Sequence, residues 1–127
     1  MVGGVRIREK SDGSNKKPTR FFSKRQEVAI AKATGGQRTP NSGATAWSKG
    51  DVLTDQFLIE AKTKTTHTDT ITLRKDWFKK NREEAAFMGK KYTAVAFNFG
   101  PDEPNYYAID EDLFLILQEC LANESNT

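Results

Sequence analysis

Among the residues of this sequence, two carboxylates and one amine have the spacing best suited to a catalytic or metal-binding site. Glu60 and Lys62 lie two positions apart, directly after the apolar residues 57–59, and Asp51 precedes Glu60 by nine positions. The β-forming residues and a Gly-Asp turn signal upstream predict a strand over Gln56–Lys64. Because side chains alternate along a strand, Glu60 and Lys62 should project from the same face.

A short hairpin over residues 51–55 would return Asp51 to the side of Glu60. It would gather two carboxylates and one ammonium at the end of the strand. Two carboxylates in contact repel each other unless a positive charge lies between them, and a hard divalent cation such as Mg²⁺ meets that need. Lys62 would then hold a water or stabilise a developing anion beside the metal. The alternative is that Glu60 and Lys62 form an ordinary surface charge pair on a solvated strand.

Together with Glu27, an acid on a predicted upstream helix, these residues resemble the PD-(D/E)XK nuclease superfamily. Sites of that family are built from an Asp, a Glu-x-Lys and often a further Glu on an N-terminal helix. Gly50 replaces the proline of the family motif. The resemblance implies an endonuclease that hydrolyses DNA phosphodiester bonds with Mg²⁺, for which Mn²⁺ substitutes. It also implies a small α/β fold with an αβββαβ core, in which helices flank a mixed central sheet.

The resemblance implies a role for each residue of the site. Asp51 and Glu60, with the main-chain carbonyl of Ala61, would bind one or two metal ions, which polarise the scissile phosphate and lower the pKa of the attacking water. Lys62 would orient that water or stabilise the charge that develops on the phosphate. Glu27 would complete the site directly or through water. Its alternative role is that of a first-turn acid that favours the helix dipole.

A loop-rich stretch over Gln37–Lys49 connects the predicted helix to the metal site, and Ser42-Gly43-Ala44 lies within it. Archaeal Holliday-junction resolvases and similar phage enzymes carry a Ser-Gly-containing loop at this place. That narrower resemblance makes Ser42 a candidate supporting catalytic residue. It implies branched DNA as the substrate and a homodimer as the active form. The alternative is that these residues form a turn whose role is purely conformational, without any part in catalysis.

The elements that must position these residues follow from periodicity, caps and chain breakers. Ser23, three residues before Gln26, predicts a capping box at the start of a helix, and Gly35-Gly36 marks the end of that helix. Thr70–Leu73 alternates and predicts a third strand. The remaining predicted elements are a helix over Lys75–Met88 with a solvated outer face that includes Glu84, strands over Tyr92–Phe99 and Asn105–Ile109, and a last helix over Glu111–Ala122 with Asp110 as its N-cap.

The charge distribution is uneven, although the net charge is only +3. Residues 1–50 contain 11 Lys and Arg against 3 acids, whereas residues 51–127 contain 9 against 14. A basic first part that leads into an acidic cluster predicts phosphate attraction on one side and metal binding on the other. The alternative is a solvated basic tail without a partner. The candidate DNA contacts are Arg6, Arg8, Lys16, Lys17, Arg20, Lys24, Arg25, Arg38, Lys49 and Lys64.

Composition limits the remaining possibilities. Residues 1–19 have almost no apolar residue after Ile7 and are predicted to form a flexible basic arm before a single domain over residues 20–127. With Cys120 as its only cysteine, the chain has neither an internal disulfide nor a zinc cluster, which suits a cytoplasmic protein and leaves oxygen atoms as metal ligands. No apolar run reaches the roughly 20 residues of a membrane span, and the N-terminus lacks the apolar region of a secretory signal.

The predicted last helix contains more apolar residues than one face of a helix holds. In so small a domain this surplus predicts a partner surface, and a second copy of the chain is the expected partner. The sequence therefore favours a Mg²⁺-dependent endonuclease that cleaves branched DNA as a homodimer. Two alternatives stay open: a nicking, repair or restriction-type nuclease that cleaves ordinary duplex, and a basic DNA-binding protein without catalysis.

Overall fold

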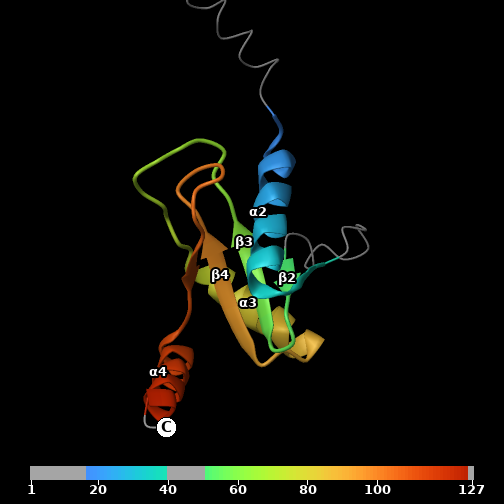
Figure 1. Cartoon of the computed structure of the whole chain (residues 1–127). Coiled ribbons are helices and arrows are strands. Elements are labelled where there is room, and N and C mark those ends of the chain that lie inside the picture. Colours follow the sequence, from blue (N-terminus) through green and yellow to red (C-terminus); the bar gives the residue numbers. More distant parts are fainter. Residues whose placement is uncertain (1–16, 40–50, 126–127) are drawn as a thin grey trace, which may run out of the picture.

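A five-stranded mixed sheet lies at the centre of the computed structural model, with helices on both of its faces (Figure 1). This arrangement confirms the predicted α/β fold. The structure describes residues 17–39 and 51–125. Its elements are α2 (Thr19–Thr34), β1 (Gln37–Arg38), β2 (Asp51–Leu53), β3 (Phe57–Lys62), α3 (Lys75–Met88), β4 (Tyr92–Phe97), β5 (Tyr106–Ala108) and α4 (Glu111–Ser125).

The strands lie across the sheet in their chain order, β1-β2-β3-β4-β5. Neighbouring strands are antiparallel except β3 and β4, which pair in parallel over their whole length. Parallel neighbours require a crossover connection, and α3 supplies it. A helix, three antiparallel strands, a second helix and a parallel strand therefore follow one another along the chain, before β5 and α4 are added.

Alternation along the strands divides the sheet into two faces that different helices cover. On one face, α2 packs through Ile30 against Val52 and Ile59, and two alanines of β4 complete this core. The intervening side chains point to the opposite face, where α3 passes behind the sheet in Figure 1 and contacts β3 and β4. Every second residue of β3, starting with Leu58, therefore faces α3.

The predicted boundaries of α3 are confirmed, whereas α2 begins earlier than predicted. α2 starts at Thr19, with Pro18 as an extended N-cap residue that makes no side-chain cap. Ser23 is the fifth residue of the helix, and its Oγ donates a hydrogen bond to the carbonyl of Arg20 at 3.2 Å. Proline fixes its own φ and sets the entry into the first turn, so the capping box is not used. Each of the two helices ends, as predicted, at a glycine in the left-handed conformation.

The predicted strand over Thr70–Leu73 is not formed, and Gln37–Arg38, which was predicted to be loop, forms β1 instead. Thr68 shows why the later segment stays irregular. Its amide donates a hydrogen bond to the carbonyl of Phe99, and its hydroxyl bonds to main-chain groups of Thr70. Hydroxyls that bond to nearby backbone compete with a strand ladder, so alternation alone did not produce a strand.

The other strands are shorter than predicted, and the last helix is longer. β3, β4 and β5 all lie within their predicted ranges. Asp110 caps α4 as predicted, because its Oδ1 accepts a hydrogen bond from the amide of Leu113 at 2.9 Å. α4 continues to Ser125, three residues beyond the predicted end. Within the part of the chain that the structure describes, no helix is long and apolar enough to cross a membrane.

Candidate functional site

β2 and β3 bring two of the predicted carboxylates together. Asp51 is paired directly with Glu60 in the antiparallel register, as the hairpin prediction required. Directly opposed residues of antiparallel strands have Cβ atoms about 5 Å apart and point to the same face. Asp51 and Glu60 therefore share the face of the sheet that α3 covers.

Lys62 lies beside Glu60 on the same face, two residues further along β3. Its Nζ is 2.9 Å from Oε2 of Glu60 and 4.5 Å from the ring centroid of Trp77 in α3. An ammonium over an aromatic ring is attracted by the negative face of the ring, which helps to fix its position. The Lys62 side chain is still 31% exposed, so the ammonium remains accessible to a ligand.

A third carboxylate, that of Glu84 in α3, reaches the same place. The prediction that Glu84 lies on a solvated face is wrong: the residue is only 4% exposed, and Asn81 and Ala85 on the same side of α3 are also buried. Asn81 orients the helix, because its Nδ2 donates a hydrogen bond to the carbonyl of Ala94 in β4 at 3.2 Å. The three residues have the i, i+3, i+4 spacing of one side of a helix, and this spacing was the available signal for their burial. Two of them are polar, so the side did not read as apolar in the sequence.

Asp51 is a buried carboxyl surrounded by other acids. It is 2% exposed, and its Oδ2 has no hydrogen-bond partner among the described residues. Burial raises the pKa of Asp51 from 3.8 to about 8, and the negative charges of Glu84, Glu60 and, least of all, Glu27 act in the same direction. Burial and the charge of Glu60 also raise the pKa of Glu84, which shares a hydrogen bond with Asp51. Near neutral pH the cluster therefore retains a proton unless a cation takes its place.

The chemistry of these three carboxylates fits a hard divalent cation. Carboxylate oxygens are the ligands that Mg²⁺ and Mn²⁺ prefer, and Oδ2 of Asp51 is a buried acceptor to which no described residue donates. In their present positions, no three or more His, Cys, Asp or Glu side chains within residues 17–39 and 51–125 are grouped to hold an ion. Glu60 directs its Oε2 to Lys62 in this arrangement. A cation at this site would have to compete with Lys62 for Glu60.

Glu27, the predicted third acid, lies on the other face of the sheet. It is 7% exposed in α2, and its Oε1 is 3.2 Å from Nε of Arg38 in β1. Arg38 is paired with Val52, which belongs to the core beneath α2. Since residues in register share a face, the sheet separates Glu27 from Glu60 and Lys62. The structure thus brings together Asp51, Glu60 and Lys62 but does not add Glu27 to them.

Ala61 is paired with Ala96 of β4, and its side chain packs against the core beneath α2. Its main chain adjoins the site, because it connects Glu60 to Lys62. The other predicted residues near the site lie outside the described ranges. These are Ser42 and the candidate DNA contacts Arg6, Arg8, Lys16 and Lys49.

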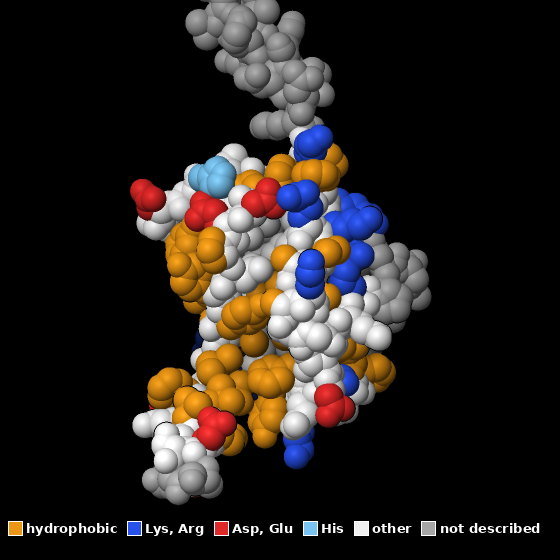
Figure 2. Space-filling view, in the orientation of Figure 1, with side chains coloured by type: hydrophobic (Ala, Val, Ile, Leu, Met, Phe, Trp, Pro, Cys, Tyr) orange, Lys and Arg blue, Asp and Glu red, His pale blue; other side chains and the backbone are white. Residues whose placement is uncertain are grey.

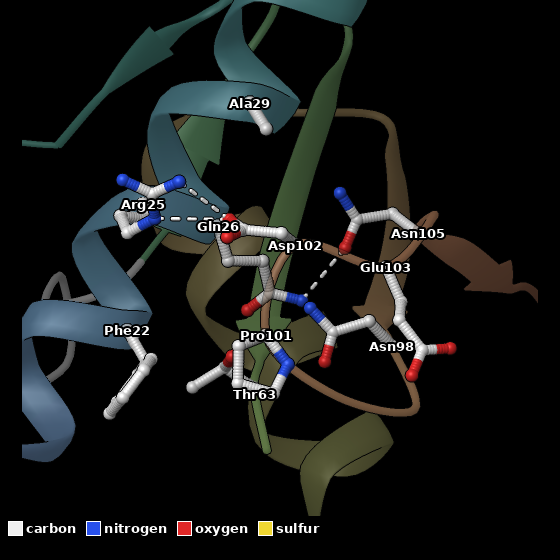
Figure 3. Close-up of a pocket in the computed structure, with 10 residues that line it drawn as sticks. All are labelled: Phe22, Arg25, Gln26, Ala29, Thr63, Asn98, Pro101, Asp102, Glu103 and Asn105. Atoms are coloured by element: carbon white, nitrogen blue, oxygen red, sulfur yellow. Dashed lines mark hydrogen bonds and ion pairs between the residues drawn. The ribbon is translucent and has the colours of Figure 1, made fainter. Parts of the chain in front are cut away.

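α2 fixes the end of β3 from the opposite face through the amide of Gln26. Nε2 of Gln26 donates one hydrogen bond to the carbonyl of Lys62 at 2.9 Å and one to Oδ1 of Asn105 at 3.0 Å. Figure 3 shows this amide in a polar pocket that the ion pair of Arg25 and Asp102 also lines. Gln26 is 4% exposed, so these bonds hold the main chain of Lys62 with little competition from water.

Most of the described candidate DNA contacts belong to the layer of α2. Figure 2 shows Lys and Arg side chains gathered along this helix. Arg38 differs from them because it is paired with Glu27, and Lys64 lies half-buried just beyond Lys62. The basic row and the carboxylate cluster thus occupy different layers of the molecule. The exposed members of the row are Lys17, Arg20, Lys24 and Arg25.

Comparison with known proteins finds no relative of this chain. No protein-family model matches it, and neither a curated protein nor a solved structure matches it.

Replacing Asp51 with Asn should stabilise the protein more strongly as the pH rises. In the unfolded chain the carboxyl keeps a pKa near 3.8, and in the folded chain its pKa is about 8. Its contribution to stability is therefore fully present below about pH 4 and is lost as the pH rises through about 8. The quantity to compare is the unfolding free energy of Asp51→Asn minus that of wild type, measured without divalent metal. We expect this difference to be at least about 1 kcal/mol larger at about pH 9 than at about pH 5.

Urea unfolding in EDTA at the two pH values measures this difference. Asp55→Asn is the matched control, because Asp55 is an exposed acid in the turn between β2 and β3. The control should show no comparable pH dependence. An effect of Asp51→Asn that is equal at both pH values would contradict the raised pKa of Asp51.

Proposed function

We propose that the protein is a Mg²⁺-dependent endonuclease that hydrolyses phosphodiester bonds in DNA. The observation that carries the proposal is the direct pairing of Asp51 with Glu60, with Lys62 2.9 Å from Glu60 on the same face. This is the Asp and Glu-x-Lys arrangement that the resemblance to PD-(D/E)XK nucleases implies. The element order also supports it, because α2, the antiparallel strands β1 to β3, α3 and the parallel strand β4 follow the αβββαβ order of that superfamily.

In this proposal, Asp51 and Glu60 hold the cation together with the main-chain carbonyl of Ala61. The bound metal would polarise the scissile phosphate and lower the pKa of the attacking water. The chain favours this arrangement electrostatically, because Asp51 is buried beside other acids and gains most from a positive charge. The burial of Asp51 also keeps water from weakening that attraction.

Lys62 supplies a second positive charge, in addition to that of the cation. Its ammonium donates hydrogen bonds, so it can orient the attacking water or stabilise the charge that grows on the phosphate as the bond to the leaving oxygen breaks. Trp77 holds the ammonium and Gln26 holds the main chain of the same residue. Restraint at both ends of the side chain favours a defined position relative to the substrate.

Branched DNA, above all a four-way junction, is the proposed substrate, and a homodimer is the proposed active form. A four-way junction presents two symmetric strands that must both be cut to give clean products. One active site in a domain of this size cuts only one strand. A two-fold dimer supplies two sites at a fixed separation, which matches the symmetry of the substrate.

α4 is the proposed dimer contact. Among the described residues of this helix, Leu113 is the one that is buried, and Figure 2 shows apolar side chains at the end of the molecule where α4 lies. α4 contains four acids and neither Lys nor Arg. Its exposed apolar residues are Phe114, Leu115, Ile116, Leu117 and Leu121.

A groove beside α4 complements the helix of a second copy. The groove has a volume of about 350 Å³ and lies between α3 and the start of α4. Its walls combine Ala85, Ala86 and Ile116 with cations on the α3 side. The cations that line the groove are Arg82, Lys90 and Lys91, and its acids are Asp110 and Asp112 at the beginning of α4. The apolar side of a second α4 could therefore pack on the groove wall with its acids beside the three cations.

Two alternatives accompany this proposal. The first is a nuclease that cleaves ordinary duplex, which would use the same arrangement of Asp51, Glu60 and Lys62. The second is a DNA-binding protein without catalysis, which the basic row along α2, remote from the carboxylates, favours. Metal-dependent cleavage separates the second alternative from the proposal, and the choice of DNA substrate separates the first.

Asp51→Asn, Glu60→Gln and Lys62→Ala should each lower Mg²⁺-dependent DNA cleavage by at least about 100-fold, because each removes a proposed metal ligand or the ammonium. Melting in EDTA should be unchanged or higher for the two carboxylate variants, since like-charge repulsion is relieved. Glu83→Gln is the matched control, because Glu83 is an exposed acid on α3. Cleavage by Glu60→Gln at a near wild-type rate would refute the proposal.

The cleavage assay should compare a four-way junction, a flap and a linear duplex, each with Mg²⁺ and with EDTA. We expect paired cuts in the junction with Mg²⁺ and none with EDTA. Equal cleavage of all three DNAs would instead indicate an ordinary duplex nuclease. Binding without cleavage of any of them would identify a non-catalytic DNA-binding protein.

The free protein should sediment as a dimer at micromolar concentration, and Leu117→Glu should sediment as a folded monomer that no longer makes paired junction cuts. A charge at this position opposes burial of the apolar side of α4. Leu73→Glu is the matched control, because Leu73 and Leu117 are both 42% exposed and Leu73 lies outside α4. A wild-type monomer, or paired cuts by monomeric Leu117→Glu, would rule out this contact.

A further inference from the structure

We propose that Glu84 of α3, rather than Glu27 of α2, is the third acidic ligand of the cation site formed by Asp51 and Glu60. The inference rests on the metal site of the proposed nuclease and assigns a further residue to it. The ligand class is a hard divalent cation, Mg²⁺ or Mn²⁺, because the available donors are carboxylate oxygens.

Contact with Asp51 is the first observation behind this proposal. The carboxyls of Glu84 and Asp51 interact through a side-chain hydrogen bond, and among neighbouring charges that of Glu84 has the largest effect on Asp51. The two residues are 4% and 2% exposed, so water does little to separate their charges. Two acids held in contact in a dry environment need a proton or a cation between them.

An unused acceptor in the cluster points to a missing ligand. Oδ2 of Asp51 is buried and has no hydrogen-bond partner among the residues that the structure describes. Lys62 does not neutralise it, since its ammonium is bound to Glu60 and Trp77. A buried carboxylate oxygen without a donor is costly, and a cation shared with Glu84 would satisfy it.

The position of Glu84 is fixed by the packing of its helix rather than by a flexible loop. Asn81, one turn earlier, donates a hydrogen bond to the carbonyl of Ala94, and Ala85, the next residue, is 3% exposed. α3 therefore presents the Glu84 carboxyl to the sheet at a defined depth. A ligand on a rigid element needs little reorganisation when the ion binds.

Glu27 differs from Glu84 in its charge partner and in its position relative to the sheet. Its Oε1 is paired with Arg38, 3.2 Å away, so its charge is already compensated. It contributes the weakest of the charge effects on Asp51. The sheet lies between it and Glu60. Each side of the sheet thus has a helical acid. Glu27 on α2 is paired with Arg38, whereas Glu84 on α3 lies beside Asp51.

Binding of Mn²⁺ alone, measured by calorimetry and by the shift in melting temperature without DNA, tests the assignment. We expect Glu84→Gln to weaken Mn²⁺ binding at least about 10-fold and to melt no lower than wild type in EDTA. Glu27→Gln is the matched control, a second buried Glu on a helix, and should bind Mn²⁺ within about 3-fold of wild type. Glu84→Asp, which keeps the carboxylate, should bind more tightly than Glu84→Gln.

The possible outcomes separate this inference from the proposed function. Unchanged Mn²⁺ binding by Glu84→Gln, in a series where Glu60→Gln loses it, would overturn the role of Glu84 and leave the nuclease proposal standing. Loss of binding in Glu27→Gln but not in Glu84→Gln would return the role to Glu27. Loss in Glu84→Gln together with an absence of any DNA cleavage by wild type would support the cation site while refuting the nuclease.

Discussion

The burial of one carboxylate against two others is the constraint on which this site depends. Asp51 is almost inaccessible to water, is paired in register with Glu60 and touches Glu84. A protein does not gain stability from such a cluster, because each negative charge raises the cost of the next. Under the proposed function, a bound cation would offset this repulsion.

Strand alternation determines which residues take part in this cluster. The β2–β3 register places Asp51, Glu60 and Lys62 on one face, and the residues between them build the apolar core beneath α2. α3 then closes the polar face with Glu84 and Trp77. The sheet thus separates the layer of α2, which contains the apolar core and the basic row, from the layer of α3, which contains the carboxylate cluster and Lys62. A one-residue shift in the register of β3 would place Glu60 and Lys62 on the face that α2 covers.

Local patterns in the sequence predicted the parts of this arrangement that depend on neighbours in the chain. The turn after β2 is short, so the pairing of Asp51 with Glu60 followed from the hairpin, and Gly89 and Asp110 marked helix boundaries correctly. The missing parts depend on packing between distant elements. The burial of Glu84 follows from the docking of α3 on β4, and β1 forms only because β2 offers it an edge. The formation of β1 leaves no local signature, and the i, i+3, i+4 spacing on the buried side of α3 is concealed by two polar residues, Asn81 and Glu84.

The most direct test of the account is the number of protons released when Mg²⁺ binds to the free protein near pH 7. Calorimetry in buffers of different ionisation enthalpy measures this number. Because the pKa of Asp51 is about 8, a cation that binds to its carboxylate must displace a proton, and about one proton should be released per site. In Asp51→Asn the release should disappear together with the binding. Mg²⁺ binding without proton release, or equal release by Asp51→Asn, would contradict the cluster as the cation site.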